Sequence, residues 1–132
     1  MPEFTGFSHL GLTISDIERS KEWYAAVLGW QLLVHDTDEN GIHFAFGLLP
    51  GGLGLGLRQH PSGSGDEFSP ERTGLDHASF AVASREELEA WESHLADSGA
   101  TYSAIVEAPY GAVLSFKDPD GIALEAFALP AG

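Results

Sequence analysis

Cysteine is absent from this 132-residue chain, and basic residues are scarce. Without cysteine the chain forms no disulfide, thiolate nucleophile or cysteine-ligated zinc site. Six Lys and Arg against twenty Asp and Glu give a formal net charge of −14. Because this charge repels nucleic-acid phosphates and anionic membranes, we expect neither as a partner.

Long apolar runs are also missing. No stretch approaches the roughly 18 apolar residues of a membrane-spanning helix, and no charged leader precedes an apolar segment. The composition is nevertheless 43% hydrophobic and 11% aromatic, which is enough for a folded core. We therefore expect a cytoplasmic, soluble protein of one compact domain or of two half-domains fused across one core.

Two segments half a chain apart resemble each other. The first is His9-Leu-Gly-Leu-Thr-Ile14 and the second is His77-Ala-Ser-Phe-Ala-Val82, at an offset of 77 − 9 = 68 residues. In both, side chains alternate between two faces as in a half-buried strand, and the histidine lies on the less apolar face. Trp23 and Trp91 are separated by the same 68 residues, which indicates an internal repeat.

Each repeat predicts a strand, a helix and three further strands. A capping box at Ser15–Glu18 predicts the start of the first helix, and Gly29 its end. A second capping box, at Ser84–Glu87, predicts the start of the second helix, and Gly99 predicts its end. The turn Asp118-Pro-Asp-Gly121 joins the last two strands. The predicted strands are 8–14, 31–35, 42–48 and 53–59, then 76–82, 102–106, 112–116 and 122–129.

The polar, Gly-, Pro- and Ser-rich stretch 61–73 is the predicted linker. It separates a first module, 1–60, from a second module, 74–132, within one combined domain. The fold class is therefore α+β, with two tandem βαβββ modules.

Glu125 interrupts the apolar run 122–129 and, with His9 and His77, forms a candidate metal site. If the helices cover the apolar strand faces, all three side chains point away from the helices. Imidazole binds Zn, Fe, Mn, Co or Ni, and a carboxylate adds negative charge and hardness. The alternative is structural, since a histidine at a strand start is usually hydrogen bonded and a strand glutamate usually faces solvent. Repetition of the histidine at equivalent positions strengthens the metal interpretation and leaves both interpretations open.

Two further residues are candidates for contact with a substrate. His60 lies at a strand end beside the linker, and Tyr110 precedes the last hairpin, where its hydroxyl could donate a hydrogen bond or a proton. A core or rim position for Tyr110 is an equal alternative. The other histidines, His35, His43 and His94, are interpreted as surface or structural residues.

These motifs resemble the vicinal oxygen chelate superfamily, the glyoxalase/bleomycin-resistance/extradiol-dioxygenase group, over nearly the whole chain. The segments that carry the resemblance are Ser-His9-Leu-Gly-Leu-Thr-Ile, Trp23-Tyr-Ala-Ala-Val-Leu-Gly29, Leu-Asp-His77-Ala-Ser-Phe and Phe116-Lys-Asp-Pro-Asp-Gly121-Ile-Ala-Leu-Glu125. The resemblance implies paired βαβββ units whose curved mixed sheets form a metal-holding cup with the helices outside, commonly in a homodimer. By position it implies His9, His77 and Glu125 as the ligands.

One departure from the ligand pattern of the family limits the reactions that the resemblance implies. Glyoxalase I enzymes take a fourth ligand from the last strand of the first module, but the position equivalent to Glu125 is Gly56 or Leu57, neither of which can bind a metal. Gln59 could face inward only through a bulge. A three-ligand set instead resembles extradiol dioxygenases, fosfomycin-type transferases and small lyases or epimerases. The fosfomycin reaction is disfavoured because Ala108–Val113 replaces the phosphonate-binding stretch and few basic residues are available.

The first functional hypothesis is a divalent-metal-dependent lyase, isomerase or dioxygenase that acts on a small oxygenated organic molecule. The metal would be Fe, Mn, Zn, Ni or Co. The alternative is a metal-free protein of the bleomycin-resistance type that sequesters a cationic drug or ligand, which the net charge of −14 and three tryptophans would suit. A two-His, one-Glu set favours the enzyme, because sequestration does not need it. A pure interaction module has no specific support.

Overall fold

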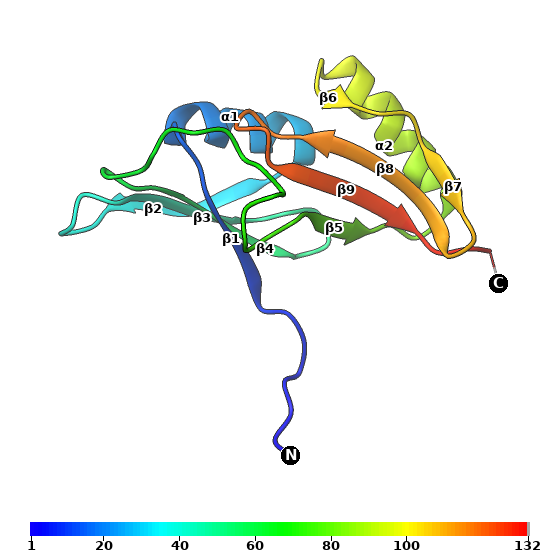
Figure 1. Cartoon of the computed structure of the whole chain (residues 1–132), viewed down its shortest axis with the longest axis horizontal. Coiled ribbons are helices and arrows are strands. Elements are labelled where there is room, and N and C mark those ends of the chain that lie inside the picture. Colours follow the sequence, from blue (N-terminus) through cyan, green and yellow to red (C-terminus); the bar gives the residue numbers. More distant parts are fainter. Residues whose placement is uncertain (132) are drawn as a thin grey trace. The chain divides into compact units, whose positions relative to one another are not determined.

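The computed structural model describes residues 1–131, and the chain divides into two compact units, Met1–Gly65 and Asp66–Gly132 (Figure 1). Each unit has one helix and one mixed sheet of its own. Among residues 1–131, no helix has both the length and the apolar character needed to cross a membrane.

The first unit has a single four-stranded sheet. Its strands lie in the order β1-β4-β3-β2; β1 is parallel to β4, and the other pairs are antiparallel. The elements are β1 (His9–Thr13), α1 (Ile17–Leu28), β2 (Gln31–Thr37), β3 (His43–Leu48) and β4 (Gly54–Gln59).

The second unit repeats this arrangement. Its main strand order is β5-β9-β8-β6, β5 is parallel to β9, and a further short strand, β7, also pairs with β8. The α+β class and the tandem βαβββ modules predicted from the sequence are confirmed. The elements are β5 (Ala78–Ala81), α2 (Arg85–Asp97), β6 (Thr101–Tyr102), β7 (Val106–Ala108), β8 (Gly111–Lys117) and β9 (Ala123–Ala128).

Each helix covers one face of the sheet in its own unit and leaves the other face uncovered by that helix (Figure 1). In the first unit, Tyr24 of α1 packs in a core with the fully buried Leu55 and Leu57 of β4. In the second, Leu88 of α2 is fully buried, as is Leu114 of β8. Burial of these apolar side chains between helix and sheet stabilises each unit.

The first helix begins one residue later than its capping box predicts. Asp16, rather than Ser15, is the N-cap, and its carboxylate accepts a hydrogen bond from the backbone N–H of Arg19. Both residue types can cap a helix, so the sequence alone does not separate them. The second helix is capped by Ser84, as predicted. Gly29 ends the first helix in the left-handed conformation, with φ 71°.

The predicted strand 102–106 is two short strands instead, β6 and β7. Between them, the backbone N–H of Ile105 donates to the side-chain carboxylate of Glu92 on α2, at 3.0 Å. Because this donor bonds to a side chain rather than to a neighbouring strand, pairing with β8 is interrupted there.

Candidate functional site

Glu125 lies in the middle of β9 with a short side chain on either side. Its register partners are Ser79 on β5 and Ser115 on β8. Its neighbours along the strand, Leu124 and Ala126, are buried toward the helix. The strand alternation therefore places the carboxylate on the face opposite α2, as predicted, and the serines leave space around it.

His77 faces this carboxylate. Its Nε2 lies 3.5 Å from Oε1 of Glu125. The predicted strand 76–82 includes His77, but β5 begins one residue later, at Ala78. The structure thus brings together two of the three predicted ligands within the second unit.

Asp76 holds the other nitrogen of the same ring. His77 Nδ1 and Asp76 Oδ1 are 2.7 Å apart. This hydrogen bond, together with the negative charge of Glu125, raises the pKa of His77 above its usual value of 6.5. A histidine whose Nδ1 is engaged by a carboxylate presents Nε2 outward, which is how metal-binding histidines are commonly oriented.

His9 repeats the arrangement in the first unit. Its Nδ1 lies 2.9 Å from the hydroxyl oxygen of Ser8, the residue that precedes it. The ring packs edge-on against Phe46, with ring centres 5.8 Å apart. A side chain at Gly54 would be too close to the Phe46 ring and to the His9 side chain, because an added Cβ would lie 2.9 Å from Phe46 Cζ and 3.0 Å from His9 Cβ.

The strand register identifies Gly56 as the first-unit counterpart of Glu125. Gly11 pairs with Gly56 in β1 and β4, just as Ser79 pairs with Glu125 in β5 and β9, and Gly11 and Ser79 are 68 residues apart. Leu57, the other candidate from the sequence, is fully buried on the opposite face. The position that carries the carboxylate in the second unit therefore has no side chain in the first.

Two residues were proposed from the sequence to contact a substrate. Tyr110 stacks on Phe127, with ring centres 6.2 Å apart and planes 5° from parallel, and its side chain is exposed. Because Phe127 shares the strand face of Glu125, Tyr110 lies beside that face. His60 directly follows β4, and its backbone carbonyl accepts a hydrogen bond from Gly63.

The donor atoms fit a divalent metal ion. In the second unit an imidazole nitrogen and a carboxylate oxygen face each other, and both groups are common ligands of Zn and of first-row transition metals. His9 belongs to the first unit, and residues 1–131 contain no group of three or more His, Asp or Glu side chains assembled to hold a metal. Sequence reasoning missed Asp76 and Ser8, although each directly precedes a predicted ligand.

Comparison with known proteins identifies the family of the chain. Residues 6–126 match the Glyoxalase/Bleomycin resistance protein/Dioxygenase superfamily. The chain belongs to this superfamily. A crystal structure of a glyoxylase/bleomycin resistance protein/dioxygenase domain from Frankia sp. EAN1pec is 42% identical, with a TM-score of 0.90, and the match covers 96% of this chain and 99% of that one.

Two solved structures of lower sequence identity share the fold. FosX, a fosfomycin resistance protein from Listeria monocytogenes crystallised with Mn(II) and sulfate, is 19% identical with a TM-score of 0.71, over 96% of this chain and 93% of that one. The crystal structure of SMU.1112c is 23% identical with a TM-score of 0.79, over 95% and 99% of the two chains. No curated protein matches the chain.

Proposed function

We propose that this superfamily member is a metal-dependent enzyme that acts on a small oxygenated organic molecule. His9, His77 and Glu125 would hold the divalent metal, which is Fe, Mn, Zn, Ni or Co. The observation that carries the proposal is the 3.5 Å approach of His77 Nε2 to Glu125 Oε1, with Asp76 holding Nδ1. The Mn(II) in the FosX crystals shows that a relative with this fold binds such an ion.

A divalent metal in this position would supply Lewis acidity, which stabilises negative charge on the oxygens of a substrate. Glu125 would reduce the charge of the ion. Asp76 would keep the His77 ring in the orientation that presents Nε2. The short side chains of Ser79 and Ser115 leave room beside the carboxylate for a small molecule.

Tyr110 is proposed to contact the substrate from the edge of the site. Its ring is held by stacking on Phe127 while its side chain stays exposed, so the phenol can donate a hydrogen bond to a substrate oxygen. His60 is proposed as a second substrate contact from the end of β4.

The proposal includes a homodimer and a cytoplasmic location, with the module boundaries 1–60, 61–73 and 74–132. The edge strand β2 supports the dimer, because its residues Leu32, Leu33 and Val34 are exposed by 39%, 59% and 53%. Apolar residues on an unpaired edge strand are typical of a surface that another chain covers.

The test is the metal content of the protein purified without chelators. We expect near-stoichiometric metal in the wild type and in a His94→Ala control, and loss of metal in His77→Ala and Glu125→Gln. Wild-type protein without metal, and with a thermal midpoint unchanged by EDTA, would overturn the proposal and favour a metal-free ligand-sequestering protein. If iron is bound, the chemistry narrows to oxygenation, whereas Zn, Ni or Mn would indicate acid–base or transfer reactions.

A further inference from the structure

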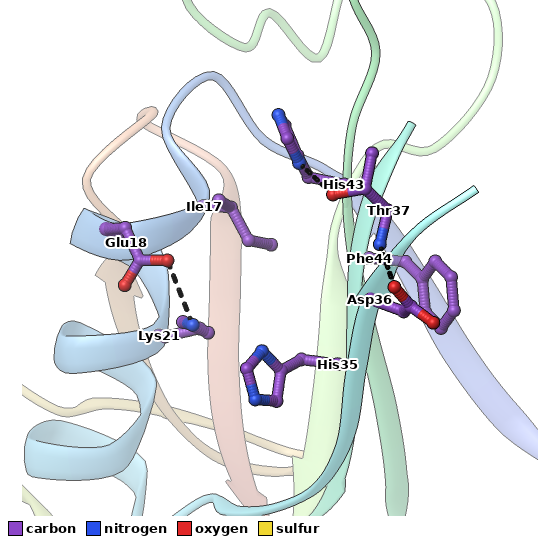
Figure 2. Close-up of a pocket in the computed structure, with 8 residues that line it drawn as sticks. All are labelled: Ile17, Glu18, Lys21, His35, Asp36, Thr37, His43 and Phe44. Atoms are coloured by element: carbon purple, nitrogen blue, oxygen red, sulfur yellow. Dashed lines mark hydrogen bonds and ion pairs between the residues drawn. The ribbon is translucent and has the colours of Figure 1, made fainter. Parts of the chain in front are cut away.

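The first unit contains a groove on the helix side of its sheet, away from the face of His9. It opens between the N-terminal half of α1 and the strands β2 and β3 (Figure 2). Its volume is ≈ 270 Å³, which suits a molecule of few heavy atoms. The residues that line it are Ile17, Glu18, Lys21, His35, Asp36, Thr37, His43 and Phe44.

The groove is lined by one lysine and two histidines, together with the acidic residues Glu18 and Asp36. Figure 2 shows His35 extending from β2 toward Lys21 of α1, whereas Asp36 lies on the other side of the strand with Phe44. Neighbouring strand residues point to opposite faces, so the carboxylate of Asp36 is turned away from the His35 imidazole. His43 and Thr37 lie at the upper end of the groove in this view.

Lys21 is well enclosed for a lysine. Only 18% of its side chain is exposed, and its Nζ lies 3.0 Å from Glu18 Oε1, whose own side chain is 77% exposed. An ammonium group has three N–H donors, so this single ion pair leaves donors for another acceptor. Among the residues that line the groove, Lys21 is the one Lys or Arg, and it shares the groove with two histidines.

The upper end of the groove is held in place by a side-chain contact. Thr37 Oγ1 lies 2.7 Å from His43 Nδ1, which fixes the ring and leaves its Nε2 for another partner. The helix backbone is not needed for binding. The first N–H groups of α1 are already engaged, that of Ile17 by Gln59 at 2.8 Å and that of Arg19 by Asp16 at 3.1 Å.

We propose that this groove binds a small oxyanion, a carboxylate or a phosphate, between Lys21 and the imidazoles of His35 and His43. Charge-assisted hydrogen bonds from an ammonium or imidazolium to an oxyanion are among the stronger polar contacts in proteins. Glu18 and Asp36 also line the groove, so it has no excess of positive charge, which disfavours a polyanion. A metal ion fits less well, because the ammonium of Lys21 repels it and no group of three His, Asp or Glu within residues 1–131 is assembled to hold one.

The test is a titration of the full-length protein with inorganic phosphate and, separately, with succinate, followed by the NMR signals of the His35 and His43 rings. Lys21→Gln removes the enclosed charge. Arg72→Gln is the matched control, since it removes a positive charge from an exposed ion pair with Asp66 in the second unit. Lys21→Arg tests rescue by a side chain that keeps the charge.

We expect at least one probe to bind saturably in the millimolar range or tighter, with shifts of both ring signals. Lys21→Gln should weaken that binding by about tenfold, while Arg72→Gln changes it by less than about twofold and Lys21→Arg restores most of it. Preference for succinate or for phosphate identifies the ligand as a carboxylate or a phosphate. No saturable shift with either probe, or equal weakening by Lys21→Gln and Arg72→Gln, would overturn the inference. The metal content of Lys21→Gln should equal that of the wild type, which separates this site from the proposed metal centre.

Discussion

Asp76 Oδ1 lies 2.7 Å from His77 Nδ1, and this contact determines which ring nitrogen faces Glu125. A ring held at Nδ1 keeps one tautomer and one orientation when a ligand or a proton approaches Nε2. Ser8 contacts Nδ1 of His9 at 2.9 Å in the equivalent place, but a hydroxyl carries no charge. The repeat makes the two histidines equivalent in position, but the Nδ1 partner of His77 is a carboxylate and that of His9 is a hydroxyl.

Replacing Asp76 tests the contribution of this contact to metal binding. Asp76→Asn keeps the shape of the side chain but removes its charge, so we expect metal affinity to fall by about 10- to 100-fold with the fold intact. Competition against a chelator of known affinity measures the change. Asp97→Asn, at the exposed end of α2, is the control and should bind metal as the wild type does. Equal affinities in both variants would contradict an orienting role for Asp76.

The contacts of His77 with Asp76 and Glu125 also predict that the stability of the metal-free protein depends on pH. The hydrogen bond to Asp76 and the charge of Glu125 raise the pKa of His77 in the folded state, so the protonated ring is favoured by folding. The resulting stabilisation is present below the unfolded pKa of about 6.5 and is lost as the pH rises through the higher folded pKa. Asp76→Asn should lower the pKa of His77 and remove part of this dependence.

Ring-proton NMR in EDTA gives the pKa of His77 directly, and thermal unfolding at about pH 5.5 and pH 8.5 gives the change in stability. Wild type and Asp76→Asn are compared at each pH, so that contributions common to both proteins cancel. Since nearly half of the His77 side chain is exposed, the stability difference should be small. An unchanged pKa of His77 in Asp76→Asn would refute the assigned cause.

Two glycines in the first sheet should differ in how much stability is lost on replacement by alanine. At Gly47 an added Cβ would meet the backbone oxygen of Gln31 and lie 2.7 Å from Trp30 Cε2, in a tightly packed part of the core. At Gly56 the nearest atom would be Phe46 Cδ2 at 3.5 Å, an ordinary contact. We expect Gly47→Ala to lower the free energy of unfolding by about 3 kcal/mol and Gly56→Ala to change it by less than about 1 kcal/mol. Urea denaturation would measure both, and equal effects would contradict the packing described at Gly47.

Features of the structure that depend on residue periodicity could be predicted from the sequence. Strand alternation predicted that Glu125 lies on the face opposite the helix, and the 68-residue offset predicted that Gly56 or Leu57 is its counterpart. These inferences need only the two-residue period of strands and the repeat itself. The register then selects Gly56, since Leu57 is fully buried on the helix side.

Features that depend on tertiary contacts were not predicted. The break between β6 and β7 arises from Glu92, which is 13 residues before Ile105 in the sequence. The groove was also missed, and His35 and His43 were interpreted as surface or structural residues. The groove exists because of the distance between α1 and the strands β2 and β3, and no local pattern of residue types determines that distance.

The missing carboxylate of the first unit can be added back at Gly56. Because Gly56 holds the register position of Glu125 and has space for a Cβ, Gly56→Glu should place a carboxylate on the same sheet face as His9 without loss of the fold. If His9, His77 and Glu125 bind the metal as proposed, a fourth ligand should raise metal affinity by about tenfold. Gly56→Gln is the control, since it has nearly the same size without the charge. Chelator competition on the two variants measures the difference, and equal affinities would indicate that position 56 does not face the metal.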